Sequence, residues 1–241
     1  MVCFALMHGG AHGGWCWEEV VPRLEALGHR AVAPDLPFGD DDGVAAWTDV
    51  VADAVGPADD VIVVGHSLGG LGVPVVAERL RARHMVFLGA MVPVPGRTYI
   101  DVLTEEPDAL LIDEVAGAMA GEDTAAAGLA DEGGALAWAF ARDHFYQDLD
   151  EAVARRAWAR LRPQGFTMFT ESCPLAAWPD IPATYICMVD DHAVNPEWSR
   201  AVARGRLGST LIELPGGHSP FYGHPDELTA TLHAIAEART D

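Results

Sequence analysis

The stretch GHSLGG, residues 65–70, carries the pattern G-x-S-x-G around Ser67. A sharp strand-to-helix turn can lift a serine hydroxyl clear of a sheet, provided that small residues two positions before and after it let strand and helix approach. Gly65 and Gly69 occupy those positions, after the apolar run VIVV and before a helical pattern. The motif predicts that Ser67 is a nucleophile. The alternative is a glycine-rich turn with an N-capping serine.

A second group of residues suited to chemistry is VDDHAVNP, residues 189–196, where two aspartates stand beside a histidine. Such a cluster could ligate a metal, cap a helix or supply the acid of a catalytic triad. On an extended chain the side chains of Asp190, Asp191 and His192 project in different directions, and no second histidine lies nearby at ligand spacing. We therefore expect no metal site there and no metal or other cofactor in the reaction.

These residues need a scaffold, and apolar runs typical of buried strands alternate with helical patterns along the chain. We expect strands at residues 3–8, 29–36, 61–66, 85–91, 183–190 and 209–215, and helices at 15–28, 43–56, 67–82, 196–207 and 225–238. Near-continuous apolar strands joined by helices imply a parallel sheet covered on both faces, because each crossover helix buries the strand that it follows. The expected fold is α/β and doubly wound, with a mostly parallel sheet.

The alternation is interrupted from residue 97 to residue 182, where no good central strand occurs. Helical patterns are present there at 105–121, 133–146 and 149–163. We interpret 97–182 as a helical lid inserted into a core made of residues 1–96 and 183–241. Most of its aromatic side chains are expected to form the lid's own core, and those facing the sheet would line a hydrophobic pocket. Our candidates for the pocket lining are His66, Trp138, Phe145, Trp158 and Phe169.

Composition limits the partners of this chain of 241 residues, which is long enough for one well-buried folding unit. With 36 acidic and 15 basic residues, its formal net charge is -21, which repels phosphate backbones and anionic lipids. We expect a small-molecule substrate and neither nucleic acid nor membrane as a partner; a homodimer stays open. All the basic residues are arginines, which excludes a lysine Schiff base and suggests a bacterial source.

The four cysteines are scattered and lie mostly in apolar contexts, so we expect buried thiols rather than disulfides or a zinc site. No secretory pattern opens the chain, and no apolar run approaches the ~18 residues that a membrane span needs. We expect a cytoplasmic protein.

Five segments of the chain match motifs of a known family: HGGAHGGWCW (8–17), GHSLGG (65–70), FLGAMVP (87–93), DDHAVNPEW (190–198) and PGGHSPF (215–221). In these motifs and their order the sequence resembles the α/β-hydrolase fold family. It is most similar to the lid-bearing subgroup of plant methyl esterases, hydroxynitrile lyases and related bacterial esterases. The resemblance covers nearly the whole chain and implies a sheet without the amino-terminal hairpin of longer relatives.

The resemblance implies a catalytic triad in the chain order serine, aspartate, histidine. His218 matches the family's late histidine, and the alternative base, His224, is expected at the start of the last helix. The family pattern of an aspartate followed closely by a proline places the acid at Asp191, with Asp190 as the alternative. The triad would therefore be Ser67, Asp191 and His218.

Negative charge that develops on a substrate carbonyl oxygen needs two N–H donors. One is the backbone N–H of Leu68, the residue after the nucleophile. By resemblance the second is the N–H of Gly10 in the glycine-rich loop after the first strand, with Ala11 as the alternative. His12, Trp15 and Trp17 are expected to anchor this loop.

These parts predict a serine hydrolase that cleaves a neutral, partly hydrophobic carboxylic ester, lactone or thioester through an acyl-enzyme. A lyase or cyclase that uses the triad without acylation is the main alternative, and a ligand receptor on a hydrolase scaffold is a minor one. The plant hydroxynitrile lyases carry a threonine after the first-strand histidine and a lysine after the catalytic histidine. This chain has Gly9 and Ser219 at those places, which favours the esterase.

Overall fold

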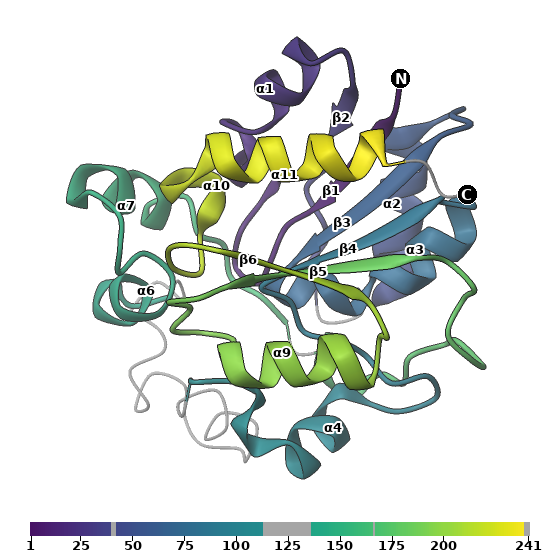
Figure 1. Ribbon diagram of the computed structural model, residues 1–241. Coiled ribbons are helices and arrows are strands. Elements are labelled where there is room, and N and C mark those ends of the chain that lie inside the picture. The colour runs from purple at the N-terminus through teal and green to yellow at the C-terminus, as the bar shows by residue number, and fades with distance from the viewer. Residues whose placement is uncertain (40–41, 113–135, 166, 239–241) are drawn as a thin grey trace.

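A computed structural model describes residues 1–39, 42–112, 136–165 and 167–238 (Figure 1). Its six strands form one parallel sheet in the order β2-β1-β3-β4-β5-β6. The strands are β1 (Cys3–Met7), β2 (Arg30–Val32), β3 (Val61–His66), β4 (His84–Leu88), β5 (Ala183–Met188) and β6 (Thr210–Leu214). All six expected strands are present, and the prediction of an α/β fold with a parallel sheet is confirmed.

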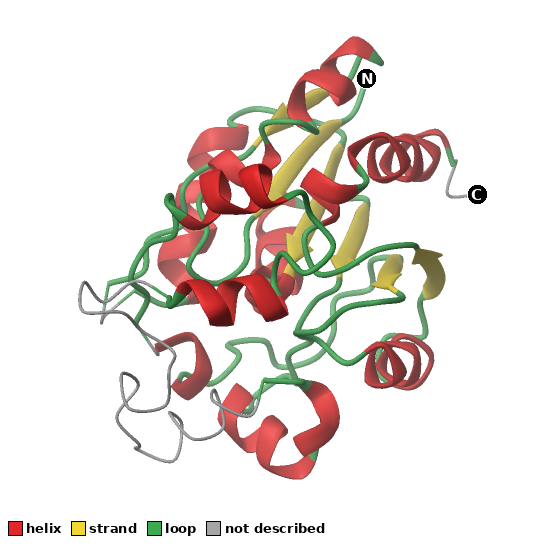
Figure 2. Cartoon of the chain, turned by 90° about the vertical axis from the view of Figure 1, so that its left-hand side faces the viewer, coloured by secondary structure: helices red, strands yellow, loops and turns green. Residues whose placement is uncertain are grey.

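Helices cover both faces of the sheet (Figure 2). On one face lie α2 (Val44–Val55), α3 (Val73–Leu80) and α9 (Pro196–Gly205), and on the other α1 (Val21–Ala26) and α11 (Pro225–Glu237). Alternate strand residues supply the two cores, because successive side chains of a strand point to opposite faces. Ala5 and Val63 belong to the first core, whereas Phe4 and Ile62 belong to the second.

Prolines and turns make several elements shorter than expected. The helix predicted at 15–28 is split into the 3-10 helix η1 (Gly14–Trp17) and α1, which has Pro22 in its first turn. The strand predicted at 29–36 ends at Val32, two residues before Pro34, which has no N–H for a sheet ladder. The helix predicted at 67–82 opens with the 3-10 helix η2 (Ser67–Leu71), and α3 follows with a proline in its first turn.

The predicted insertion, residues 97–182, contains only helices and isolated bridges in its described part. Its elements are α4 (Tyr99–Glu105), η3 (Pro107–Ala109), α6 (Trp138–His144), α7 (Glu151–Trp158) and α8 (Thr167–Thr170). A helix starting at residue 105 was the wrong expectation: α4 ends there, Pro107 follows, and Leu110 instead forms a bridge with Val194. Residues 113–121 of that predicted helix lie outside the described residues.

The short helix α10 (Pro220–Gly223) leads into α11, and together they carry the chain back across the sheet. In Figure 1, α6, α7 and α10 gather at one end of the sheet, at the left. Within the described residues, no helix combines the length and the apolar character required to cross a membrane.

Candidate active site

Ser67 directly follows β3 as the first residue of η2, in a strained turn. Its φ of 51° is in the left-handed region, which a side chain with a Cβ adopts at a cost. A Cβ on Gly65 would come within 2.3 Å of Cγ2 of Val73, and one on Gly69 within 2.6 Å of the carbonyl oxygen of His8. Both glycines of the G-x-S-x-G motif are therefore needed for the close approach of strand, helix and neighbouring loop.

Asp191 and His218 meet at the carboxyl edge of the sheet, because they follow the neighbouring parallel strands β5 and β6. Nδ1 of His218 lies 2.9 Å from Oδ2 of Asp191, and both side chains are buried. The other carboxylate oxygen of Asp191 accepts hydrogen bonds from the backbone N–H groups of Ala193, at 2.7 Å, and Val194, at 3.0 Å. Asp190, the alternative acid, is exposed.

This pairing sets the state of the imidazole. An ionised carboxylate only accepts hydrogen bonds, so with Asp191 as the acceptor the Nδ1–H group of His218 is the donor of this bond. Nε2 then presents a lone pair, which is the form that a general base requires. His224, the alternative base, instead lies at the amino-terminal end of α11, with Nδ1 3.8 Å from Oε1 of Glu227.

The loop after β4 makes room for the acid. Gly89 has a φ of 46°, and a Cβ there would lie 3.0 Å from Oδ2 of Asp191. The next peptide is fixed by Tyr185 of β5, whose hydroxyl donates to the carbonyl oxygen of Ala90 at 2.8 Å and accepts from its N–H at 2.9 Å. Glycine in FLGAMVP was a visible signal at this place, whereas the role of the tyrosine carried none in the sequence.

The glycine-rich loop after β1 packs directly against the nucleophile. A Cβ on Gly9 would lie 2.7 Å from Cβ of Ser67. The carbonyl oxygen of Gly9 accepts from Nδ1 of His8 at 2.9 Å and from the N–H of His12 at 3.4 Å. In a trans peptide the N–H points opposite to the C=O, so these bonds orient the N–H of Gly10 away from them.

The two backbone N–H groups that are expected to bind the oxyanion are free to donate hydrogen bonds to a ligand. Neither the N–H of Gly10 nor that of Leu68 has an acceptor in the part of the chain that the structure describes. The N–H of Ala11, the alternative donor, is occupied by Oε1 of Gln164 at 2.7 Å. Gln164 was missed by the sequence analysis, because nothing in its local sequence links it to a loop more than 150 residues away.

Three further histidines near the site are held neutral by burial. Desolvation lowers the pKa of His8 to about 4 and that of His12 to about 3. The pKa of His66 is lowered well below its ordinary value for the same reason. Their hydrogen bonds suit neutral rings: Nε2 of His8 accepts from the N–H of Leu36 at 2.9 Å. They shape the site without adding positive charge to it.

Comparison with known proteins assigns the fold to a family. A family model described as the Alpha/beta hydrolase family matches residues 4–231. The chain belongs to the α/β hydrolase family. The match covers nearly all of the sequence, which confirms the resemblance found from its motifs.

Several named proteins are similar to this α/β hydrolase. Esterase PIR7B of Oryza sativa subsp. japonica is 38% identical over 130 residues, which cover 46% of this chain and 48%, about half, of the rice protein. The carbendazim hydrolyzing esterase of Nocardioides sp. is 29% identical, over 98% of this chain and 100% of that protein. The crystal structure of polyneuridine aldehyde esterase matches with a TM-score of 0.78 at 19% identity, covering 98% of this chain and 100% of that chain.

The expected pocket residues of this α/β hydrolase fall in four places. Phe145 stacks on the ring of His218, with centroids 5.5 Å apart and planes at 29°. His66 is fully buried beneath the site, where its Nε2 donates to the carbonyl oxygen of His218 at 2.8 Å. Trp138 and Trp158 pack against each other at 5.6 Å, and Phe169 contacts Tyr99 at 6.2 Å.

Residues of the predicted lid also hold the glycine-rich loop. The backbone N–H of Arg162 donates to the carbonyl oxygen of Ala11 at 2.7 Å, and its guanidinium donates to that of His12 at 2.7 Å. Tyr146 donates its hydroxyl proton to Nε2 of His12 at 2.9 Å, since Nδ1 of that ring donates to the carbonyl oxygen of Gly10. The insertion thus supports the candidate oxyanion donors from outside the sheet.

Proposed function

We propose that this α/β hydrolase is a serine carboxylesterase, with Ser67 as the nucleophile, His218 as the base and Asp191 as the acid that orients it. The observation that carries the proposal is the buried bond between His218 and Asp191 at the sheet edge where Ser67 stands in its strained turn. Relatives named as esterases, among them one matched over its whole length, support the same reaction class.

In the proposed reaction, Oγ of Ser67 attacks the ester carbonyl carbon while Nε2 of His218 takes the hydroxyl proton. The N–H groups of Gly10 and Leu68 stabilise the oxyanion of the tetrahedral intermediate. The intermediate collapses, the C–O bond to the alcohol breaks, and the alcohol leaves with the proton from His218. Water then attacks the acyl-enzyme with His218 again acting as base. The bond from the acyl carbon to Oγ of Ser67 breaks, the serine regains its proton from His218, and the carboxylic acid is released.

The substrate that we propose is neutral and partly hydrophobic. Phe145 stacks on the ring of His218 and also contacts His12, and this aromatic surface favours an apolar acyl or alcohol group. The net charge of -21 disfavours anionic substrates. We also propose that residues 97–182 act as a lid, because Phe145, Tyr146 and Arg162 belong to this insertion and contact the site.

A serine-reactive fluorophosphonate tests the nucleophile. Incubation followed by intact mass and peptide mapping should show one adduct per chain, on the peptide that contains Ser67. Ser67→Ala should give no adduct, and His218→Ala should label far more slowly, because the hydroxyl has lost its base. Labelling elsewhere, or equal labelling rates in native protein and His218→Ala, would contradict the assignment.

A second assay separates the esterase from a cyanohydrin lyase. Departing cyanide needs a cation, and Ser219 follows His218 where the plant lyases have a lysine. We expect hydrolysis of small neutral aryl or alkyl esters and no cleavage of mandelonitrile above the buffer rate. Rapid release of cyanide that depends on Ser67, without ester hydrolysis, would favour the lyase.

A further inference from the structure

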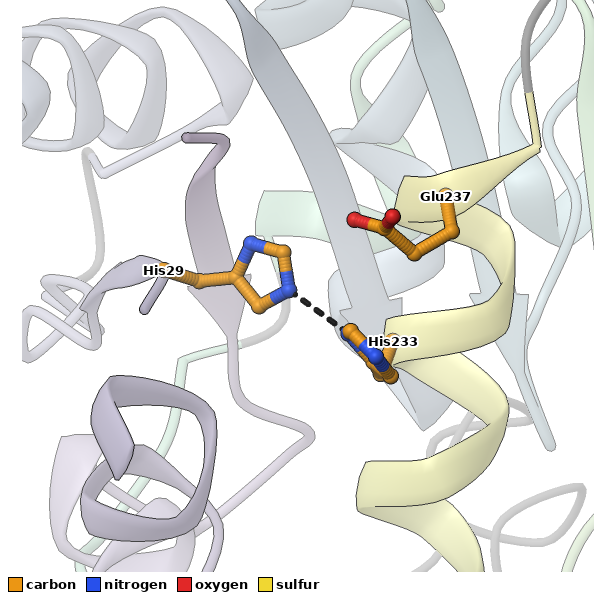
Figure 3. Close-up of side chains that lie close together, drawn as sticks. All are labelled: His29, His233 and Glu237. Atoms are coloured by element: carbon orange, nitrogen blue, oxygen red, sulfur yellow. Dashed lines mark hydrogen bonds between the residues drawn. The ribbon is translucent and has the colours of Figure 1, made fainter. Parts of the chain in front are cut away.

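Three potential metal ligands meet at the amino-terminal edge of the sheet, away from the triad. His29 lies between α1 and the start of β2, while His233 and Glu237 lie one turn apart on α11. Figure 3 shows both rings and the carboxylate directed toward the space between β2 and the last turn of α11. Two elements that are far apart in the sequence thus contribute ligands of the types that zinc prefers, two imidazoles and a carboxylate.

The ligand atoms are close enough to share one ion. Nε2 of His29 lies 2.9 Å from Nδ1 of His233, and one ligand atom from each of the three residues lies within 4.8 Å of the other two. Ligands at zinc bond lengths of ~2.0–2.1 Å are about 3.3 Å apart in a tetrahedral shell. The rings would separate by a few tenths of an ångström, and the exposed Glu237 carboxylate would move inward.

A hydrogen bond between two neutral imidazoles uses one proton for two facing nitrogens. If the donor ring moves that proton to its other nitrogen, both facing nitrogens present lone pairs and no net proton is lost. A cation can then bind both rings, and the carboxylate of Glu237 supplies negative charge to offset it. A protein with a net charge of -21 also attracts cations.

The three residues are held by packed structure. The ring of His29 meets Phe4 of β1 edge-on at 5.3 Å, and its backbone N–H donates to the carbonyl oxygen of Leu24 at 3.1 Å. On α11, residues four apart share one face, and Leu232 beside His233 is fully buried in the same core as Phe4. A site built on such elements changes little when its ligand binds.

We propose that His29, His233 and Glu237 bind one divalent transition-metal ion of the zinc type, with water as a fourth ligand. The ion would tie the last turn of α11 to the β1–β2 side of the sheet and so stabilise the fold. Imidazole nitrogen disfavours Mg²⁺ and Ca²⁺, which prefer oxygen ligands. The hydrolysis proposed above takes place at the opposite edge of the sheet and uses no metal, so the two proposals are independent.

The test is zinc binding to the metal-stripped full chain, measured by calorimetry with zinc sulfate. We expect one ion per chain with a Kd of micromolar order or tighter. His233→Gln should weaken binding at least about 100-fold and Glu237→Gln about 10-fold, because each removes one ligand. His84→Gln is the matched control, because His84 starts β4 at the same edge and belongs to no ligand cluster among the described residues. This variant should bind zinc as the native chain does.

Two further readouts identify the site. At a free zinc concentration of about 100 times the Kd, Tm should rise by about 5–10 °C in the native chain and not in His233→Gln. X-ray absorption should show nitrogen and oxygen ligands without sulfur, which excludes the four cysteines. His233 and Glu237 are not in the buried core, so their variants keep the test meaningful even if His29→Gln folds poorly.

Absence of binding up to about 100 μM zinc would overturn the proposal. So would binding that survives in both His233→Gln and Glu237→Gln, or a shell that contains sulfur. Fluorophosphonate labelling of Ser67 is measured on the same samples. It should be unchanged by zinc and by these variants, so failure of the metal site is distinguished from failure of the esterase assignment.

Discussion

Two pairs of side chains that each contain a histidine lie at opposite edges of the same sheet. In both pairs the facing atoms are 2.9 Å apart. At the carboxyl edge, His218 donates to Asp191, and both side chains are buried. At the amino edge, His29 faces His233, a second imidazole on a partly exposed helix. The distances are equal, but the partners differ. A carboxylate polarises an imidazole for proton transfer, whereas a second imidazole duplicates it as a ligand.

The comparison shows that the partner and its surroundings, rather than the distance, decide what a histidine can do. In a parallel sheet, the loops after neighbouring strands meet at the carboxyl edge, and α/β proteins bind substrates there. The amino edge receives the loops that enter the strands and the end of α11. Variants at the two edges should therefore separate catalysis from stability.

The largest expected effect on activity follows from loss of the buried pair of His218 and Asp191. His218→Ala should lower kcat/KM for a neutral ester by at least ~10³-fold, since Ser67 would lose its proposed base. His233→Gln at the other edge should stay within about twofold of the native value, because that residue touches no catalytic group. Steady-state hydrolysis of an activated ester measures both. Equal losses in the two variants would remove the distinction between the edges.

The next effect concerns the acid. Asp191→Asn should lower kcat by roughly 10²–10³-fold, because an amide cannot balance the positive charge that forms on His218. Asp190→Asn removes an exposed carboxylate one residue away and should change kcat by less than about twofold. The acid would have to be reassigned if the second variant lost more activity than the first.

Two glycines offer a matched pair of substitutions. Gly9→Ala places a Cβ 2.7 Å from Cβ of Ser67, so the loop must shift and ester turnover should fall by about 10–100-fold. A Cβ on Gly28 at the amino edge meets nothing within 4 Å, but its φ of 84° disfavours a side chain. Gly28→Ala should keep full activity and lose about 1 kcal/mol of unfolding free energy in urea. Full activity in Gly9→Ala, together with a loss of activity in Gly28→Ala, would mean that the glycine-rich loop tolerates displacement.

The smallest expected effect is a pH slope. His12 is neutral when folded because burial lowers its pKa to about 3, from an ordinary value of 6.5. Below pH 6.5 the imidazole of His12 binds a proton in the unfolded chain but stays neutral in the folded one. The free energy of unfolding that depends on the neutral, buried ring is therefore fully present above pH 6.5 and is lost as the pH falls toward 3. Native stability should drop by about 1 kcal/mol between pH 6 and pH 5 from this residue alone.

Urea unfolding at the two pH values checks the slope. His12→Gln should have a shallower pH dependence than the native chain, whatever its absolute stability. His192→Gln, which removes an exposed imidazole, serves as the control for loss of a histidine. An unchanged slope in His12→Gln would mean that its ring is protonated in the folded state.

The sequence was sufficient for the architecture. The apolar runs predicted all six strands of the sheet. The G-x-S-x-G glycines lie where a Cβ would collide with Val73 and His8. The pairing of Asp191 with His218 was implied by the resemblance to the α/β-hydrolase family, and the two side chains do meet in the structure. Element ends were harder, because Pro34 and Pro107 stop strand and helix patterns that periodicity alone extends.

Long-range polar contacts could not be predicted. Gln164 and Arg162 hold the glycine-rich loop from an insertion whose path is set by packing, so no spacing in the sequence indicates them. The pairing of His29 with His233 has the same origin, since 204 positions separate them. The catalytic roles of Ser67, Asp191, His218, Gly10 and Leu68 stay predictions until activity is measured.

The left-handed backbone of Ser67 bears on any attempt to improve this protein by selection. Glycine adopts that conformation freely, so Ser67→Gly should relieve about 1 kcal/mol of backbone strain while it removes the proposed nucleophile. A screen for heat resistance alone would therefore enrich inactive chains at this position. Stabilised catalysts would come only from selections that score turnover and survival together.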